Sequence, residues 1–127
     1  MIAGWLRPIR CYVSPAGRNK IADWYNGLTK QEQADADEFI KNARKLRSWE
    51  LPLYRKLTNG EGLGELRWTS EKKRQRLIGF FEDETWYAVI GCIHKQDIYT
   101  PPDCLETAKT RKKQIERREV QAVEYDL

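Results

Sequence analysis

The stretch from residue 85 to residue 93, "TWYAVIGCI", most constrains what this chain can fold into. It is a nearly uninterrupted apolar run, which is typical of a central strand buried on both faces. Directly before it, "RQRLIGFFE" reads as another strand, and "EDE" fits a turn between the two. A further strand, "ELRWT", precedes them after a glycine-rich connection. The second half of the chain therefore predicts a sheet built around hairpins.

Two helices are expected in the first half, after a short strand in "PIRCYVSP". Ser14 and Pro15 suit the N-cap and first turn of one helix. Thr29 and Glu32 have the spacing of a capping box, so a second helix should begin at Lys30. The apolar positions at helical spacing are Ile21, Trp24, Tyr25 and Leu28 in the first helix, and Phe39, Ile40, Ala43 and Leu46 in the second.

A third helix is expected near the end of the chain. Thr100 offers an N-cap, prolines follow at the first two helical positions, and "CLETAKTRKKQIERRE" continues the helix. The last residues, "VQAVEYDL", are expected to fray. The predicted fold is α+β: a single twisted, mainly antiparallel β-sheet with two N-terminal helices packed on it and a C-terminal helix. A chain of 127 residues and 15.0 kDa fits one domain over residues 1–127.

Cysteine and histidine usage argues against several kinds of site. The three cysteines are odd in number and widely spaced, which fits neither a disulfide framework nor a CxxC metal site. One histidine cannot supply the ligand set of a catalytic zinc site. We therefore expect no metal and no cofactor. No apolar run approaches the ~18 residues of a membrane span, so we expect a cytoplasmic protein with no membrane partner.

Positive charge is concentrated on a predicted hairpin, "GLGELRWTSEKKRQRLIGFF". The formal net charge of +4 and the pI near 9.0 suggest an anionic partner, nucleic acid above all. Within the hairpin only Glu65 and Glu71 oppose five cations. The cations are Arg67, Lys72, Lys73, Arg74 and Arg76.

Strand alternation limits which of these side chains can meet. Arg67 and Arg76 can lie on the same exposed face across the hairpin. On the following strand Lys95 continues the parity of Tyr87 and Val89, whereas His94 points the other way. This alternation weighs against His94 facing the same site.

The second half of the chain resembles the RelE/ParE toxin superfamily, and most of all its HigB or phage Gp49-like branch. That branch has a Leu-Tyr-Glu-Leu-Arg strand, a Tyr-Arg-Val strand, a strand ending in Phe-x-Lys-Lys, and a Thr-Pro that opens a helix. The matching positions here are Glu65, Leu66, Arg67, Arg76, Lys95, Thr100, Pro101 and Ala108. Gly64 and Gln96 depart from the pattern, standing in place of a tyrosine and of the second lysine.

The resemblance implies the toxin of a type II toxin–antitoxin system with a RelE-like fold. Its expected activity is ribosome-dependent cleavage of mRNA, with the ribosome, mRNA and a cognate antitoxin as partners. The antitoxin is expected to be a helix-turn-helix protein that joins the toxin in a hetero-oligomer. Attack by the RNA's own 2′-OH needs a base, an acid and charge stabilisation, and arginines can supply the last.

Residue roles follow as expectations from this chemistry. Arg67 and Arg76 would bind phosphate and stabilise the transition state, and Lys95 would contact phosphate or transfer a proton. His94 suits either proton role, and Tyr99 would stack on a base or act as an acid. Lys72, Lys73 and Arg74 would attract RNA from the turn, and Lys112 and Lys113 would offer ribosomal RNA a basic helix surface.

Less specific interpretations remain open. Arg67 could simply pair with Glu65, Lys95 could be a solvated strand end, and His94 could be structural. The whole chain could instead be a ParE-like inhibitor of DNA gyrase, an RNA-binding module without catalysis, or a defunct prophage remnant. Sequence patterns of fold do not separate these functions.

Overall fold

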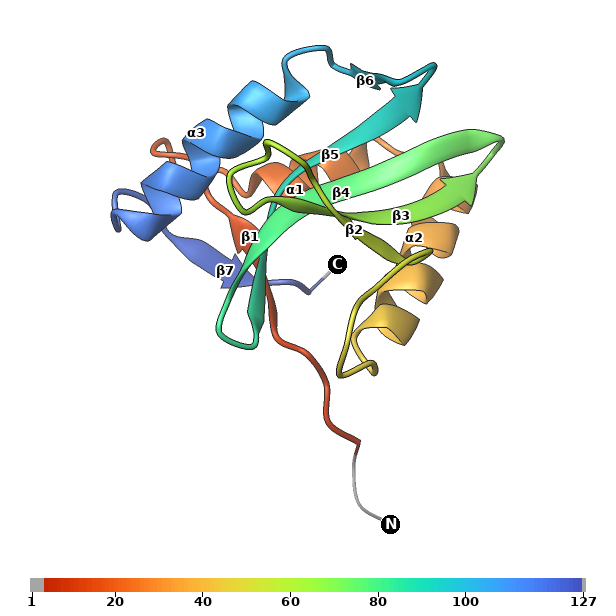
Figure 1. The fold of residues 1–127 in the computed structure, drawn as a ribbon, viewed down its shortest axis with the longest axis horizontal. Helices are drawn as coiled ribbons and strands as arrows, with labels where there is room; N and C mark the ends of the chain where they lie inside the picture. The colour runs from red at the N-terminus through yellow and green to blue at the C-terminus, as the bar shows by residue number, and fades with distance from the viewer. Residues whose placement is uncertain (1–3, 127) are drawn as a thin grey trace.

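A computed structural model describes residues 4–126 of the chain (Figure 1). Within these described residues, three helices and seven strands follow one another along the sequence. In order they are β1 (Ile9–Tyr12), α1 (Lys20–Asn26), α2 (Lys30–Ala43), β2 (Tyr54–Lys56), β3 (Gly64–Ser70), β4 (Lys73–Glu82), β5 (Thr85–Lys95), β6 (Ile98–Thr100), α3 (Cys104–Glu116) and β7 (Ala122–Glu124). This order confirms the predicted α+β fold.

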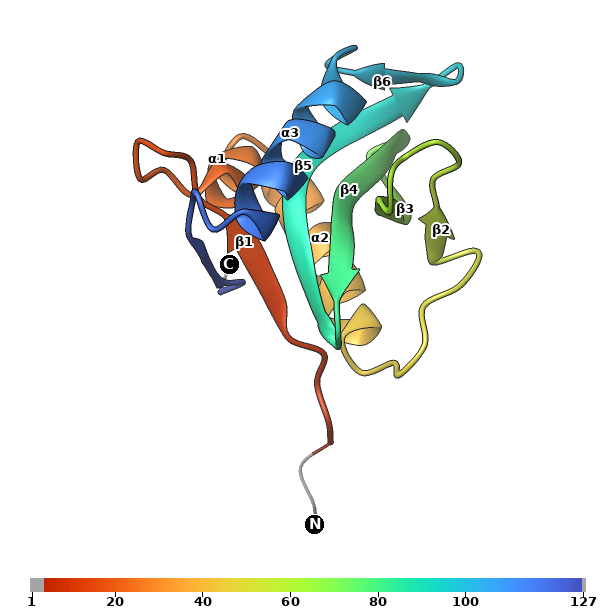
Figure 2. The ribbon, with the colours of Figure 1, turned by 60° about the vertical axis from the view of Figure 1, so that its left-hand side comes forward.

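The strands form one mixed, mainly antiparallel sheet in the order β2-β3-β4-β5-β1-β7. β1 runs parallel to β5, and β6 pairs with the far end of β5. The prediction for the apolar run is confirmed, since β5 lies between β4 and β1. Figure 2 shows α3 crossing β5 on one side of the sheet, with α2 on the other side.

Each face of the sheet has its own core. Leu66, Leu77 and Trp86 face α1 and α2, and they pack with Ile21 and Ile40 of those helices. The second face carries Ile78, Phe80 and Cys92 under α3, which packs on β4 and β5. We call these the helix-pair face and the α3 face.

Bare backbone at Gly91 lets α1 approach the helix-pair face closely. A Cβ atom at this position would lie 2.3 Å from Nε1 of Trp24, so the indole rests directly on the strand. The same indole meets Trp68 edge to face, with ring centroids 6.2 Å apart. Glycine is therefore a packing requirement of this strand rather than a turn residue.

Several predicted boundaries are confirmed and others are wrong. Thr29 and Glu32 form both hydrogen bonds of the predicted capping box, and α2 begins at Lys30. The first helix, however, begins at Lys20 with Asn19 as its N-cap, because the Asn19 side chain accepts from two helix N–H groups. The segment after Ser14 forms a turn instead.

The other corrections lie at helix ends and at the C-terminus. Leu46 falls beyond α2 and is exposed. Thr100 belongs to β6, so α3 begins only at Cys104 and has Asp103 as its N-cap. The expected fraying is wrong for Ala122–Glu124, which pairs with β1 as β7, and Tyr125 next to it is buried. None of the helices described between residues 4 and 126 is long and apolar enough to cross a membrane.

Candidate nucleic-acid site

Two arginines lie side by side on the α3 face. Arg67 on β3 is the direct cross-strand partner of Arg76 on β4, which is in turn the partner of Cys92 on β5. Directly opposed residues share a face of a sheet, so both guanidinium groups point to the side of Cys92. The structure therefore places them together, as the strand alternation predicts. We call them the Arg67–Arg76 pair.

One buried carboxylate serves both arginines. Glu65 has 2% of its surface exposed, and its Oε1 lies 3.6 Å from Nε of Arg67 and 3.7 Å from Nε of Arg76. Its Oε2 accepts a hydrogen bond of 2.5 Å from the Tyr99 hydroxyl. The expectation that Arg67 pairs with Glu65 is correct, yet the same carboxylate also faces Arg76. Two cations and one anion leave an excess of one positive charge.

The arginines keep hydrogen-bond donors that nothing within residues 4–126 accepts. Nε of Arg67 and Nε of Arg76 are both buried without a hydrogen-bond partner in that part of the chain. Nη1 of Arg76 donates to the backbone oxygen of Gln75 at 2.8 Å. Burial lowers the pKa of Arg76, the Glu65 carboxylate opposes this effect, and the Arg67 charge adds to it. Guanidinium stays charged even so, and buried donors without partners are costly.

His94 lies on the same face as the arginines, which corrects the expectation from strand alternation. The pairing of β4 with β5 passes from Ile78–Ile90 directly to Gly79–Ala88, so Val89 is an extra residue in β5. Such a bulge reverses the parity of the residues beyond it. His94 therefore shares the face of Tyr87 and Val89, and Lys95 does not.

Tyr99 reaches the site because of a strand that the sequence did not reveal. β6 pairs with the end of β5, and this places Tyr99 opposite His94. The centroids of the two rings lie 4.9 Å apart, with an angle of 55° between the ring planes. Burial and the Glu65 carboxylate raise the pKa of Tyr99 far above its ordinary value. Its proton is thus held in the bond to Glu65, which disfavours a role as an acid.

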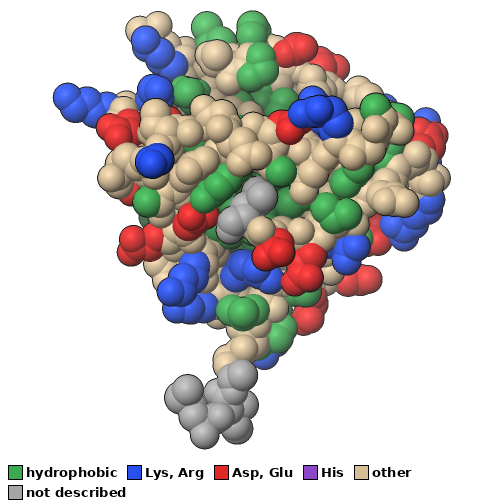
Figure 3. All heavy atoms as spheres, turned by 180° about the vertical axis from the view of Figure 1, so that it is seen from behind, with side chains coloured by type: hydrophobic (Ala, Val, Ile, Leu, Met, Phe, Trp, Pro, Cys, Tyr) green, Lys and Arg blue, Asp and Glu red, His purple; other side chains and the backbone are tan. Residues whose placement is uncertain are grey.

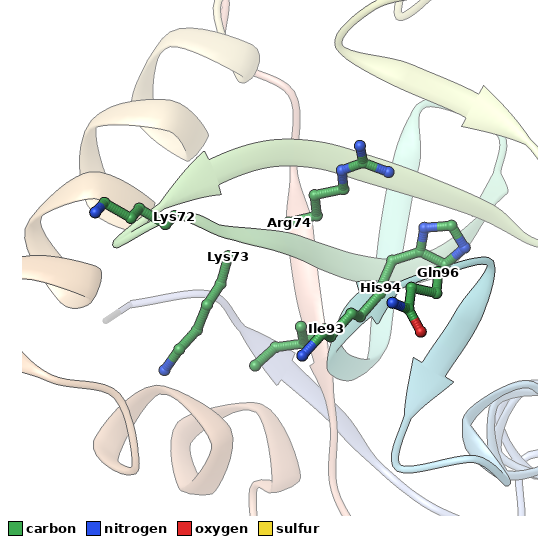
Figure 4. Close-up of a pocket in the computed structure, with 7 residues that line it drawn as sticks. Lys72, Lys73, Arg74, Ile93, His94 and Gln96 are labelled. Carbon is green, nitrogen blue, oxygen red and sulfur yellow. The ribbon is translucent and has the colours of Figure 1, made fainter.

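Lys95 lies apart from the Arg67–Arg76 pair. The pairing of β4 with β5 is regular from Ile90 to His94, and Lys95 is the next residue of the strand, so by alternation Lys95 and Ile93 point to the helix-pair face. Lys73 shares that face, and its Nζ lies 3.7 Å from Glu32 of α2. Figure 4 shows the Arg74 and His94 side chains directed away from that of Lys73.

The predicted RNA-binding residues fall into different environments. Lys72 lies in the exposed turn between β3 and β4, and Arg74 is exposed on the face of the Arg67–Arg76 pair. Lys113 is exposed on α3. Lys112 is mostly covered, because its Nζ lies 2.9 Å from Glu116 and 5.3 Å from the centre of the Phe80 ring. Lys112 therefore serves α3 packing in this arrangement.

Two hollows adjoin these residues. The first, of about 380 Å³, is lined by Pro52, Arg67, Trp68, Thr69, Arg74 and Arg76. The second, of about 420 Å³, lies at the ends of β4 and β5 and is lined by Lys72, Lys73, Arg74, Ile93, His94, Lys95 and Gln96 (Figure 4). We call them the arginine hollow and the tip hollow. Within residues 4–126, no three His, Cys, Asp or Glu side chains are grouped to hold a metal ion.

The sequence interpretation missed the buried partners of the site. Glu65 precedes Arg67 by two strand positions, so alternation alone could have placed it on the same face. Cys92, next to Arg76, is buried in the same cluster as Cys104 of α3, and this neighbour together with burial raises the pKa of the Cys92 thiol. Nothing in the spacing of the cysteines indicates this contact.

The comparisons with known proteins identify the family. A family model described as "Phage derived protein Gp49-like (DUF891)" matches residues 23–113, which include both arginines and most of α3. No curated protein and no solved structure matches the chain significantly. The matched residues make up well over half of the chain. The chain therefore belongs to the phage-derived Gp49-like family, which is part of the RelE-like toxin–antitoxin group.

Proposed function

We propose that this chain is a toxin that cleaves mRNA on the ribosome through the Arg67–Arg76 pair. Membership of the Gp49-like family suggests a toxin of the toxin–antitoxin kind. The observation that supports nuclease chemistry is the pair itself. Two adjacent guanidinium groups share one carboxylate and keep buried Nε donors free. A phosphate group offers the missing acceptors and the missing negative charge.

The proposed reaction uses the RNA's own 2′-OH as nucleophile. The 2′-oxygen loses its proton and bonds to phosphorus, while the bond from phosphorus to the 5′-oxygen breaks and that oxygen gains a proton. The products are a 2′,3′-cyclic phosphate and a free 5′-hydroxyl. The extra negative charge on the phosphorane would fall beside Arg67 and Arg76. Preorganised donors of this kind contribute about 10²–10³-fold in rate.

His94 is the residue we assign to proton transfer. It lies on the face of the Arg67–Arg76 pair, one position nearer the end of β5 than Cys92 along that face. A neutral imidazole has one ring nitrogen that accepts a proton and one that donates, so the side chain suits either step. Tyr99 becomes a positioning residue that orients Glu65 through its hydroxyl.

The cognate antitoxin would neutralise or cover this cationic face. Charge complementarity between an acidic partner and the exposed Arg74 and Lys72 would speed association. A small helix-turn-helix protein encoded in the neighbouring reading frame would support this part of the proposal. We expect the two proteins to co-purify as a hetero-oligomer.

The decisive test maps mRNA ends in cells after induction of the wild-type chain and of Arg76→Lys. Lysine keeps the charge beside Glu65 but removes the forked donor set, so the fold should survive while cleavage falls about 10²–10³-fold. Lys30→Gln, which removes one exposed charge on α2, is the matched control and should cleave like wild type. Circular dichroism checks that each variant is folded.

The other outcomes identify the alternative functions. Intact mRNA together with a DNA-damage response would point to a gyrase inhibitor. RNA that is bound by purified protein yet never cut, with or without ribosomes, would point to a binding module. Equal cleavage of naked RNA in the absence of ribosomes would contradict the ribosome-dependent part of the proposal.

A further inference from the structure

The tip hollow contains cations that the proposed reaction does not use. Lys73 and Lys95 point to the helix-pair face, on the opposite side of the sheet from the Arg67–Arg76 pair. Ile93 points to the same face as Lys95 and gives the lining of the hollow an apolar part. A group on the α3 face cannot meet the amines of these lysines through the sheet. Their proximity to each other therefore needs a separate explanation.

Lys95 has no ion pair within residues 4–126. Its side chain is exposed and lies beside Lys72, Lys73 and Arg74 in the lining of the hollow. Of these four cations only Lys73 has a carboxylate partner in the described chain, namely Glu32 at 3.7 Å. Like charges gathered around one concave surface repel one another unless an anion lies between them. The hollow is accordingly complementary to a group with negative charge.

Arg74 connects this hollow with the arginine hollow. It lines both of them, because it lies at the start of β4 with its side chain on the face of Arg76. His94, the cross-strand neighbour of Arg74, also lines the tip hollow. Positive charge thus continues from Arg67 and Arg76, through Arg74, around the ends of β4 and β5. One small anion cannot lie on both faces of the sheet, whereas a chain of phosphates can pass around the ends of β4 and β5.

We infer that the tip hollow is a second RNA subsite, in which Lys73 and Lys95 hold backbone phosphates of the strand whose scissile phosphate lies at the Arg67–Arg76 pair. This inference rests on the proposed function and adds the path of the substrate. The ligand is single-stranded RNA, bound through its phosphodiester backbone. Lys95 acts in binding and not in the reaction. Because amines and an aliphatic side chain line the far end, binding there should not depend on base identity.

Binding of uncleavable RNA of two lengths tests the inference. Fluorescence anisotropy would compare 2′-O-methyl oligonucleotides of three and of ten residues, which lack the nucleophilic 2′-OH. The variants are Lys95→Gln and Lys73→Gln/Lys95→Gln, with Lys30→Gln/Lys41→Gln as a control that removes two exposed charges from α2. The double variant at the tip should bind the ten-residue RNA about tenfold more weakly than wild type. Its plot of log affinity against log salt should be shallower by about 1.4, since each phosphate contact on a single strand contributes about 0.7.

The short RNA separates this subsite from the reaction site. The three-residue RNA should bind wild type and both tip variants equally, while Arg76→Lys should weaken binding of both lengths. If the tip variants weaken the two RNAs equally, Lys95 belongs to the reaction site and the inference is wrong. It is also wrong if the control loses as much affinity as the tip variants.

The two proposals can fail separately. Wild-type protein that binds the long RNA through Lys73 and Lys95 but never cuts mRNA would contradict the nuclease and leave the subsite standing. Tip variants that bind isolated RNA normally but lose affinity for ribosomes would assign the hollow to ribosomal RNA and overturn the substrate path. Lys73 also faces Glu32, so its substitution removes an ion pair as well as an RNA contact. Lys95→Gln removes no ion pair of the described chain and is therefore the control for folding. This single variant should lower the salt slope by half as much as the double variant.

Discussion

Two buried glutamates, one on each face of the sheet, have contrasting surroundings. Glu32 is 4% exposed and lies under the helix-pair face; Glu65 is 2% exposed and lies on the α3 face. Glu32 accepts from the backbone of Thr29 and from Nε2 of Gln75, and Lys73 lies nearby. The Glu65 carboxylate accepts a hydrogen bond only from Tyr99 within residues 4–126, although two guanidinium groups face it.

The contrast distinguishes a carboxylate with a structural role, Glu32, from one whose neighbouring donors still lack an acceptor, Glu65. Around Glu32 the carboxylate accepts from its neighbouring donors, and the one buried atom of this network without a partner in the described chain, Oε1 of Gln75, is an acceptor, which an anionic ligand cannot satisfy. Around Glu65 the excess lies on the donor side, because two buried Nε groups have no acceptor in the described chain. Buried polar groups are normally paired, so an excess of donors at the border of a hollow indicates an anionic ligand. This is the physical basis for assigning the proposed reaction to the α3 face.

The largest effect is expected from Glu65→Ala. Its removal leaves Arg67 and Arg76 facing each other at close range, with Arg76 nearly buried. Loss of one partner of a buried ion pair costs about 3–5 kcal/mol. Urea unfolding should show this loss in low salt, and added inorganic phosphate should restore part of it. A variant as stable as wild type would mean that the Arg67–Arg76 pair does not depend on Glu65.

Arg67→Gln should affect activity more than stability. Arg67 is the more exposed of the two arginines, so its removal leaves Glu65 paired with Arg76. Cleavage should fall about 100-fold, the loss typical of one transition-state donor. The measurement is the rate of mRNA cleavage on purified ribosomes, with thermal unfolding as the check on folding. A change in unfolding temperature without a change in rate would assign Arg67 to structure alone.

Glu32→Gln is the counterpart on the other face, and it should affect stability but not the chemical step at the Arg67–Arg76 pair. The hydrogen bond from the Thr29 backbone, together with Lys73 and Gln75, lowers the pKa of Glu32 below its usual range. A lowered pKa adds stability above the unfolded value near 4.3, and this contribution is lost as the pH falls through the folded value.

The variant should therefore be about 1–2 kcal/mol less stable than wild type at pH 7, and the difference should shrink below about pH 4. Urea unfolding at several pH values measures it. At saturating ribosome and mRNA concentrations, the cleavage rate of the folded variant should equal that of wild type, because Glu32 lies on the opposite face from the Arg67–Arg76 pair. A difference that persists at low pH would show that the charge of Glu32 is not what stabilises the fold.

Lys72→Gln should have the smallest effect. Lys72 lies in the exposed turn after β3, where its charge attracts RNA at long range without a fixed contact. Association with ribosomes should slow by no more than about threefold at low salt, and the difference should vanish near 0.5 M salt, where screening is strong. Stopped-flow binding measures this rate. A loss that persists at high salt would indicate a direct contact.

Local sequence signals predicted those parts of the fold that depend on neighbouring residues. The capping box at Thr29 and Glu32 and the apolar run of β5 are local patterns, and both are confirmed. β6 and β7 are three-residue strands that exist because β5 and β1 offer them an edge, so no local pattern announces them.

The candidate site shows the same limit. Alternation placed Arg67 and Arg76 on one face, but one extra residue, Val89, exchanged the expected positions of His94 and Lys95. A bulge depends on how two strands pack and not on a residue type that can be read from the chain. The shared carboxylate likewise needed tertiary contacts, since Tyr99 reaches Glu65 only through the pairing of β6.

Figure 3 shows the side of the molecule that faces away from the viewer in Figure 1, with basic, acidic and hydrophobic side chains interspersed. Such a mixed surface offers RNA no continuous cationic track. The basic residues that line the arginine hollow and the tip hollow are contiguous instead. RNA binding is therefore expected to depend on those hollows more than on net charge.

The most direct test of the contrast between Glu65 and Glu32 follows the side-chain N–H signals next to each carboxylate. Heteronuclear NMR would follow the Nε–H groups of Arg67 and Arg76 and the Nε2–H₂ group of Gln75 during titration with 2′-O-methyl RNA. We predict that the arginine signals shift and gain protection from exchange as phosphate accepts their hydrogen bonds, while the Gln75 signals beside Glu32 stay in place. Arginine signals that do not move at saturating RNA would contradict the assignment of the Arg67–Arg76 pair to phosphate binding.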